Sequence, residues 1–486
     1  MATEAAQPLR NVAPSLQPPP LSSLSSGDGG GGRAPAVIPS IHTSHPAIQD
    51  PIGSQSSALQ SETVDECLAF LTGEELRGGT NAHGLPRLDR ERHARFLHKQ
   101  MGRLPGQFMA ADASRPWIFY WSLGGLALLG EDVTSYRETL AGTVRSVQNP
   151  TGGFGGGPGQ TSHLATTYAT MLALTLVGGD EAYEVVDRRS MWKWLCSLKQ
   201  RDGGFTMAIG GEEDVRGAYC AAVIISLLNL PLDLLPDSPA RRGGHNTLFD
   251  GLGEWIGKCQ TYEGGVSAKL GTEAHGAYAF CALGCLSILD SPHKSIPRHV
   301  NVPRLISWLS SRQYAPEGGF SGRTNKLVDG CYSHWVGGCW PLIEASLSGP
   351  QDAAAAGRQQ GHQQGQQQAE SQNLFSRDAL IRYILCCCQD TSKRGGMRDK
   401  PSKNSDAYHT NYVLAGLSSA QHKWTLVSAR SESAAQDGDV WVVSPYAGVE
   451  QIFDEVDRVS PIHPVYAIPQ SKVDGVRHYF ATKTGF

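Results

Sequence analysis

Apolar residues recur every three to four positions along several stretches of the chain, which is the spacing of buried helices rather than of strands. The clearest stretches are rich in alanine and cover residues 166–177, 216–228 and 274–289. Shorter helical patterns precede them, as at 191–198 and 302–309. Strand patterns are scarce. The pattern therefore predicts an all-α protein built from helical hairpins.

A glycine turn recurs between these helices. Each copy has Gln or an equivalent residue, a short polar gap, Gly-Gly and usually Phe, followed by a loop and an apolar helix. The copies are 148–154, 200–205, 260–266, 313–320 and Gly395-Gly396-Met397, and their glycine pairs lie 51, 61, 54 and 77 residues apart. The longest step contains a Gln/Ala-rich insert. A period of about 50 residues indicates one supersecondary unit per repeat.

Such hairpins can stack into an open solenoid or close into a ring. Polar and aromatic residues occur at the start of the second helix in successive repeats, namely Arg216, Tyr219, His275, Tyr332, Trp335, Tyr408 and His409. If these helix starts point at one centre, the side chains meet in a single cavity, and helix N-termini favour anions. This arrangement favours the ring.

Low-complexity segments flank and interrupt the repeats. Residues 1–60 are rich in Pro, Ser and Gly, and about 350–373 form the Gln/Ala tract. Neither can bury enough apolar surface to offset the entropy of ordering, so both are predicted to be disordered. The expected organisation is a tail at 1–60, hairpin repeats at 61–430, and a C-terminal extension at 431–486 that packs on the repeats.

Charge and cysteine content exclude several classes of protein. The formal net charge is −4, and no block of Lys or Arg occurs, which argues against nucleic acid as a partner. No apolar run is long enough for a membrane span, and the first residues contain no apolar segment of the kind found in a secretory leader, so neither is expected. The eleven cysteines are odd in number and contain no C-x-x-C, which favours free thiols in the cytoplasm. Cys386-Cys387-Cys388 follows an apolar helical run, so packing is the better interpretation.

The strongest chemical signal is Asp329-Gly-Cys331, which lies ten residues after a Gly-Gly-Phe turn. The equivalent region of the next repeat holds Tyr408-His409. Asp, Cys and His are zinc-ligand types, and three protein ligands leave a fourth position open for a substrate. Taken singly, the three residues could instead be a helix cap, a packed thiol and a core histidine. Arg323 and Lys326, just before Asp329, could hold a phosphate. A metal that activates a thiol, beside cations that hold a phosphate, suggests a transferase with a diphosphate leaving group.

These motifs resemble those of the β subunits of protein prenyltransferases over about residues 62–430, plus 459–468. The matching segments are Arg323-x-x-Lys326-x-x-Asp329-Gly-Cys331-Tyr332-Ser-x-Trp335, Glu273-Ala-His275-Gly-x-Tyr278-x-Phe-Cys281, Asp214-Val-Arg216-x-Ala-Tyr219 and Tyr408-His409-Thr-x-Tyr412. The resemblance implies an α/α toroid that pairs with an α subunit. It also implies prenyl transfer to the cysteine of proteins that end in a CaaX motif, such as small GTPases.

The resemblance assigns roles to individual residues. It implies one Zn²⁺ held by Asp329, Cys331 and His409, whose two negative ligands cancel the charge of the ion so that an added thiolate stays nucleophilic. The positions that match its diphosphate site are His275, Arg323, Lys326 and Tyr332, to which the α subunit adds a lysine. The matches to its apolar substrate cavity are Trp117, Tyr120, Trp121, Tyr219, Tyr278, Cys281, Trp335, Tyr408 and Tyr412, and Arg216 matches a further substrate-binding position.

Two positions bear on the length of the prenyl donor. Trp117 matches a bulky residue that closes the pocket in the members using farnesyl diphosphate, and Tyr412 adds bulk beside it. Asp399 matches an acidic residue tied to Mg²⁺ dependence, where the members that use the 20-carbon donor have lysine. Both favour the 15-carbon donor. One departure is His334, which stands where the family usually has an aromatic residue.

Other readings stay open at this point. They are a type I geranylgeranyltransferase β subunit, or a noncatalytic helical repeat protein without zinc. A terpene cyclase on the same kind of toroid would need an Asp-rich protonation motif, which the sequence lacks. A lanthionine-type cyclase would use other zinc ligands and no Arg/Lys pair.

Overall fold

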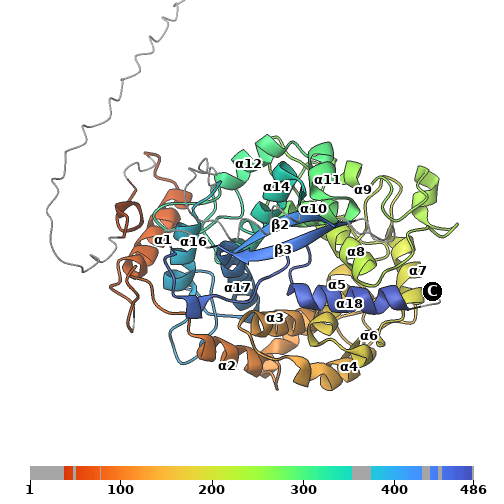
Figure 1. Ribbon diagram of the computed structural model, residues 1–486, viewed down its shortest axis with the longest axis horizontal. Coiled ribbons are helices and arrows are strands. Elements are labelled where there is room, and N and C mark those ends of the chain that lie inside the picture. Colours follow the sequence, from red (N-terminus) through yellow and green to blue (C-terminus); the bar gives the residue numbers. More distant parts are fainter. Residues whose placement is uncertain are drawn as a thin grey trace, which may run out of the picture. The chain divides into compact units, whose positions relative to one another are not determined.

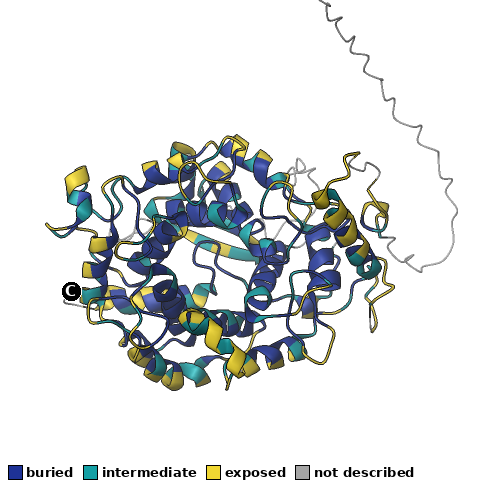
Figure 2. Cartoon of the chain, turned by 180° about the vertical axis from the view of Figure 1, so that it is seen from behind, coloured by how far each residue is buried: buried dark blue, intermediate teal, exposed yellow. Residues whose placement is uncertain are grey.

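The computed structural model describes residues 38–46, 51–76, 78–352, 374–429, 438–446 and 451–483, all within one unit, Val37–Phe486. The helices form two concentric rings, which can be followed in Figure 2. The inner ring consists of α3 (Arg115–Leu128), α5 (Leu164–Val177), α8 (Val215–Leu227), α10 (Gly276–Leu289), α13 (Tyr332–Trp335) and α17 (Ala407–Gln421). Each contacts the next, and α17 contacts α3, which closes the ring.

The outer helices precede their inner partners in the sequence (Figure 1). They are α2 (Arg90–Gln100), α4 (Arg137–Arg145), α7 (Arg188–Leu198), α9 (Leu252–Lys258), α12 (Val302–Ser310) and α16 (Arg377–Arg382), the last continuing into a π-helical turn, Tyr383–Cys388. Further helices are α1 (Gln55–Leu71), α6 (Asp180–Tyr183), α11 (Pro292–His299), α14 (Cys339–Ser348) and α18 (Gln470–Thr482). The predicted α/α toroid is confirmed.

The recurring glycine turns explain how neighbouring hairpins lock together. Each is closed by an antiparallel bridge, Gln148↔Phe154, Lys199↔Phe205, Gln260↔Val266, Gln313↔Phe320 and Gln389↔Met397. The first glycine of every pair has positive φ, from 70° to 102°, which other residues rarely adopt. A Cβ on Gly203 would lie 2.3 Å from the backbone oxygen of Gly251, so the turn packs directly on the next outer helix.

The same contact completes the ring. In the last repeat, a Cβ on Gly395 would lie 2.7 Å from the backbone oxygen of Arg92 in α2, the first outer helix. The second glycine, Gly396, packs on the ring of Phe96 in that helix. The fifth turn therefore contacts the first repeat in the same way that each earlier turn contacts the repeat after it. The architecture is thus a closed toroid rather than a solenoid.

One small sheet departs from the all-helical expectation. β2 (His422–Ala429) continues directly from α17 and pairs antiparallel with β3 (Gly438–Pro445), from His422↔Pro445 to Ala429↔Gly438. β1 (Gln351–Asp352) pairs in parallel with β2 through Gln351↔Val427. Trp424 and Leu426 of β2 are buried. The sheet lies across one face of the ring (Figure 1).

The C-terminal part of the chain covers the same end of the toroid. The Tyr219 hydroxyl of α8 donates to the Val465 carbonyl at 2.7 Å, and that of Tyr120 in α3 donates to Ala467 O at 3.0 Å. Helix α18 contacts α5 and α8. We call residues 459–468 the plug segment. These contacts join it to α3 and α8, two inner helices with α5 between them, so it covers one end of the inner ring.

The predicted disorder of 1–60 and 350–373 falls largely outside the described residues. Within them it is wrong for three stretches. Helix α1 begins at Gln55, where Ser54 and Ser57 form a reciprocal capping box, and His42 is buried with its Nδ1 3.2 Å from Pro316 O. Gln351 and Asp352 belong to β1. Specific caps and contacts with the toroid order these residues despite their composition.

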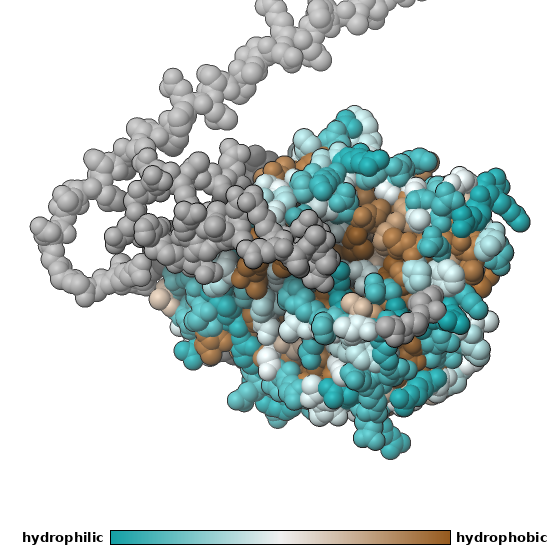
Figure 3. All heavy atoms as spheres, turned by 45° about the vertical axis from the view of Figure 1, so that its right-hand side comes forward, coloured by the Kyte–Doolittle hydropathy of each residue, from teal (hydrophilic) through white to brown (hydrophobic). Residues whose placement is uncertain are grey.

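Two other predictions concern the cysteines and the absence of a membrane-spanning helix. All eleven cysteines are free and buried, and Cys386, Cys387 and Cys388 pack in the core as predicted. No helix in the described part of the chain combines the length and apolar character needed to cross a membrane. Figure 3 shows hydrophilic residues over much of the face it presents, with apolar residues gathered in a hollow.

Candidate metal centre and aromatic circuit

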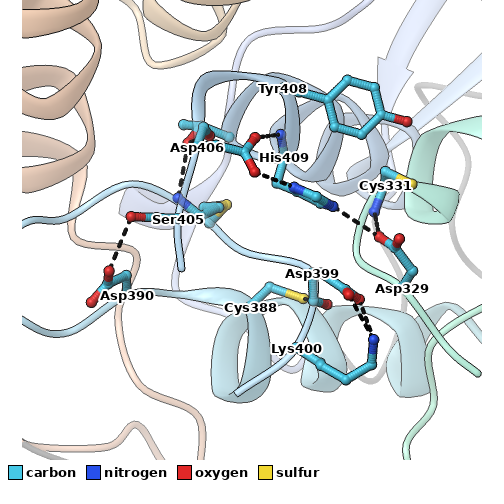
Figure 4. Close-up of polar contacts among 12 residues, drawn as sticks. Asp329, Cys331, Cys388, Asp390, Asp399, Lys400, Ser405, Asp406, Tyr408 and His409 are labelled. Atoms are coloured by element: carbon cyan, nitrogen blue, oxygen red, sulfur yellow. Dashed lines mark hydrogen bonds and ion pairs between the residues drawn. The ribbon is translucent and has the colours of Figure 1, made fainter. Parts of the chain in front are cut away.

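Three potential metal ligands meet where two repeats adjoin. Asp329 and Cys331 precede α13, and His409 lies in the first turn of α17, the next inner helix. Their ligand atoms all lie within 4.8 Å of one another, and His409 Nε2 is 3.2 Å from Asp329 Oδ1 (Figure 4). Ligand atoms of a tetrahedral zinc site stand about 3.3–3.6 Å apart. A carboxylate, a thiol and an imidazole at this separation fit such an ion.

Local hydrogen bonds fix the ligands. The backbone N–H of Cys331 donates to Asp329 Oδ1 at 2.8 Å, which holds the carboxylate and the thiol in one turn. Asp406 is the N-cap of α17 and accepts from the backbone N–H of His409 at 2.8 Å. Its other oxygen lies 2.7 Å from His409 Nδ1 (Figure 4). Asp406 thus holds the proton on Nδ1 and leaves Nε2 to face Asp329, the usual support for a metal-bound histidine.

A cation that binds at this centre would displace protons from its ligands. Burial alone would lower the pKa of His409, but the hydrogen bonds with Asp329 and Asp406 raise it to about 10. Burial, and then the charge of Asp329, raise the pKa of the Cys331 thiol well above its usual value. Both groups therefore carry protons at neutral pH. A cation bound between them would take over the role of the imidazolium as partner of Asp329.

A cationic and hydroxyl cluster lies beside this centre. His275 is the N-cap of α10, and its Nε2 lies 3.0 Å from the Tyr332 hydroxyl at the start of α13. Burial, followed by the positive charge of Arg323, lowers the pKa of His275 to about 4. Arg323 ion-pairs with Glu273 at 2.9 Å. His275, Arg323 and Tyr332 are therefore brought together, while Lys326 is exposed further along the same loop.

Asp399 lies next to the metal centre and already has a cationic partner. Lys400 Nζ lies 2.6 Å from both carboxylate oxygens, and its side chain is only 7 % exposed (Figure 4). Burial, and then the charge of Asp329, raise the pKa of Asp399. The backbone oxygen of Asp399 accepts from Gly330 N at 2.9 Å. This ties the Asp399 loop to the residue between the two candidate ligands.

The inner ring is lined by a closed circuit of aromatic side chains. Successive ring centroids lie between 4.4 and 5.9 Å apart, in the order Trp117, Trp121, Tyr408, Tyr412, Trp335, Phe280, Tyr219, Tyr168 and back to Trp117. They come from α3, α17, α13, α10, α8 and α5. The circuit forms a continuous apolar wall between the metal centre and the plug segment.

The remaining predicted residues fall on the rim of this wall. Arg216 makes a bidentate pair with Asp214, and its guanidinium lies 5.5 Å from the ring centre of Tyr278. Tyr278 in turn packs on His275 at 5.0 Å. Cys281, one turn further along α10, is buried. None of these predicted residues lines the separate cavity of about 640 Å³ that includes Trp441 and His463 under the sheet.

His334 is the departure noted in the sequence, and the structure buries it behind the aromatic wall. It lies 4.5 Å from Phe280 and 5.2 Å from Tyr412, the second contact stacked. Neither of its ring nitrogens has a hydrogen-bond partner among the described residues. Burial lowers its pKa to about 3, so the neutral ring serves as an aromatic spacer. The two unpaired nitrogens distinguish it from a phenyl ring, which would fill the site without that cost.

Several residues of this site were missed by reading the sequence. Asp406 was detectable, because an Asp just before an apolar helix is a typical N-cap. Tyr168 and Phe280 were not, since their apolar helices give no sign of which face meets the central space. Lys400 follows Asp399 directly, but its burial depends on tertiary packing.

Comparisons with known proteins agree with this geometry. The family model of the prenyltransferase alpha-alpha toroid domain matches residues 88–468. The protein farnesyltransferase subunit beta of Pyricularia oryzae is 58 % identical over 459 residues, which cover 93 % of this chain and 86 % of the relative. The chain belongs to the protein farnesyltransferase β-subunit family.

More distant relatives place this β subunit within the wider group. The protein farnesyltransferase subunit beta of Saccharomyces cerevisiae is 36 % identical, with 81 % of each chain covered. The geranylgeranyl transferase type-1 subunit beta of Arabidopsis thaliana is 27 % identical over 68 % of this chain and 84 % of its own. The solved structure of Candida albicans protein geranylgeranyltransferase-I complexed with GGPP shares the fold, with a TM-score of 0.59, 19 % identity, and coverage of 81 % of this chain and all of that one.

Proposed function

We propose that this β subunit, with an α subunit, transfers a farnesyl group from farnesyl diphosphate to the cysteine of proteins that end in a CaaX motif. One observation carries the proposal: the candidate metal triad and the cluster of His275, Arg323 and Tyr332 meet at one end of an aromatic-lined space. A thiol and a diphosphate could therefore be held side by side, with the prenyl chain against the aromatic wall.

Asp329, Cys331 and His409 would hold Zn²⁺, which when bound supplies a Lewis acid that lowers the pKa of the substrate thiol. Side chains of the protein would stabilise the leaving group. His275, Arg323, Tyr332 and Lys326 would donate to the diphosphate, whose negative charge grows as the bond between its oxygen and the first prenyl carbon breaks. The sulfur forms the new bond to that carbon, and diphosphate leaves. Because the ring of His275 is neutral, its N–H can donate a hydrogen bond to the diphosphate without a change in protonation.

The test of the proposal is transfer by the heterodimer. Labelled farnesyl and geranylgeranyl diphosphates would be offered with peptides that do or do not end in CaaX. We expect farnesyl transfer only to the CaaX peptides. Equal use of both donors would favour the type I geranylgeranyl enzymes, and the absence of transfer with metal-loaded heterodimer would contradict the proposal.

Trp117 is expected to limit the length of the donor. Its indole packs between Trp121 and Tyr168, where a fourth isoprene unit would need space. A buried steric overlap costs about 1–3 kcal/mol, or roughly 10- to 100-fold in discrimination. Trp117→Thr, alone or with a smaller residue at Tyr412, should therefore raise kcat/KM for geranylgeranyl relative to farnesyl diphosphate by that factor. An unchanged ratio in both variants would show that Trp117 does not limit the length of the donor.

Asp399 is expected to support Mg²⁺ bound with the diphosphate. Its carboxylate is paired with Lys400, so the ion must compete with that ammonium group for it. Asp399→Asn keeps the shape but removes one charge, which should raise the Mg²⁺ concentration for half-maximal rate by about tenfold. Asp399→Lys should make the rate nearly independent of Mg²⁺. Rates measured against Mg²⁺ at saturating donor decide this, and an unchanged half-saturation in both variants would assign the ion to other groups.

A further inference from the structure

Hydrogen bonds from outside the loop hold the loop that carries Arg323. Residues 321–328 form a short hairpin closed by the bridge Ser321↔Val328. The Thr324 hydroxyl donates to Glu263 Oε2 at 3.1 Å, and Trp308 Nε1 donates to the same oxygen at 3.1 Å. Arg312, only 5 % exposed, donates to Thr324 Oγ1 at 3.1 Å. This network fixes the backbone at Thr324, and therefore the direction in which the preceding residue, Arg323, leaves the loop.

A second glutamate holds the guanidinium itself. Glu273 Oε2 accepts from Arg323 Nη1 at 2.9 Å, and the two side chains are 55 % and 38 % exposed. Glu273 stands two residues before His275, the N-cap of α10, whose ring contacts Tyr332. The carboxylate thus lies at the edge of the cluster to which we assign the diphosphate. Any anion that binds His275 and Tyr332 would approach Glu273 as well as Arg323.

We propose that Glu273 is a positioning residue that occupies Arg323 in the donor-free enzyme and competes with diphosphate for it. This inference rests on the proposed function of the Arg323 cluster. The ion pair keeps the guanidinium at the cluster before the donor arrives. Because carboxylate and diphosphate repel each other, Glu273 also weakens binding of the donor and of the pyrophosphate product. Return of Arg323 to Glu273 would then favour release of pyrophosphate.

The chain offers a matched control for the charge. Glu212 occupies the equivalent place one repeat earlier, two residues before Asp214, the N-cap of α8. Its side chain is exposed and has no ion pair with a guanidinium among the described residues. Glu273→Gln and Glu212→Gln therefore remove the same charge from the same structural position, but only the first releases an arginine of the diphosphate cluster.

The experiment measures binding of inorganic pyrophosphate to the heterodimer by calorimetry, at two ionic strengths. E273Q should bind it about 3- to 10-fold more tightly at low salt, with a smaller gain at high salt, and E212Q should stay within about twofold of the parent. In turnover, E273Q should lower KM for the donor and strengthen inhibition by pyrophosphate. Thermal unfolding serves as the control for the fold and should be unchanged, since both glutamates are exposed.

Arg323→Ala distinguishes a wrong assignment of the diphosphate site from a wrong assignment of the competing role of Glu273. It should weaken pyrophosphate binding, and Glu273→Gln should tighten binding less in the R323A background than in the parent, because only the repulsion between Glu273 and pyrophosphate is then left to relieve. If R323A binds as the parent does, the assignment of the diphosphate site fails. If R323A weakens binding but E273Q leaves it unchanged or weakens it too, the proposed function stands and the competition by Glu273 is overturned. The same holds if E212Q tightens binding as much as E273Q.

Discussion

Cys331→Ala should reduce turnover of the heterodimer by at least about 10³-fold while leaving its affinity for farnesyl diphosphate within about threefold of the parent. The thiol is one of three candidate ligands whose donor atoms lie within 4.8 Å, so its loss leaves a carboxylate and an imidazole to hold the cation. The groups assigned to the diphosphate come from other positions and remain in place. His409→Ala should behave in the same way.

Metal content and single-turnover rates measure this effect together. The parent should hold one zinc per β chain, and C331A and H409A should hold far less. Cys388→Ala is the matched control, because its buried thiol lies near the centre, 3.7 Å from the backbone oxygen of Asp399, but is no candidate ligand (Figure 4). C388A should keep its zinc. Full zinc content and normal turnover in C331A would refute the ligand assignment.

Asp406→Ala should weaken zinc binding by about 10- to 100-fold, although Asp406 is not itself a candidate ligand. The carboxylate fixes the imidazole of His409 through Nδ1 and caps α17 through the backbone N–H of the same residue. Removing it frees the ring to rotate away from Asp329 and costs the helix a cap, which is worth about 1 kcal/mol. The measurement is competition for zinc with a chelator at fixed pH.

Asp406→Asn tells these two contributions apart. An asparagine oxygen can still cap the helix and accept from Nδ1, so the orientation survives while the negative charge is lost. D406N should therefore lose less zinc affinity than D406A. Because the charge of Asp406 helps to raise the pKa of His409 to about 10, D406N should also release less proton when zinc binds at neutral pH. Equal losses in D406A and D406N would show that charge, not orientation, matters.

The sequence was most informative where local chemistry repeats. A glycine pair followed by an apolar helix predicts the same hairpin at each position, and the bridges at Gln148, Lys199, Gln260, Gln313 and Gln389 confirm it. The candidate ligands could be found because two of them sit at equivalent places in consecutive repeats. Closure of the ring could only be favoured, since it depends on the contact of Gly395 with Arg92, more than 300 residues earlier.

The sheet was missed for a different reason. β2 continues α17 without a turn, so the helical pattern masks the point where the period changes from three or four to two. The alternation of Lys423, Trp424, Thr425 and Leu426 is present, and Trp424 and Leu426 are the buried members. Four alternating residues directly after a long helical pattern are too few to predict a strand.

The position of the plug segment bears on how the cavity is made during synthesis. The wall begins with α3 near residue 115, ends with α17 near 421, and is covered at one end by residues 459–468. Most of the wall helices therefore leave the ribosome before α17, which contacts α3, and the plug segment have been synthesised. Contacts of such sequence separation are costly in loop entropy and form slowly. The apolar lining faces the solvent until then, so we expect the growing chain to be bound by chaperones that recognise exposed aromatic surface.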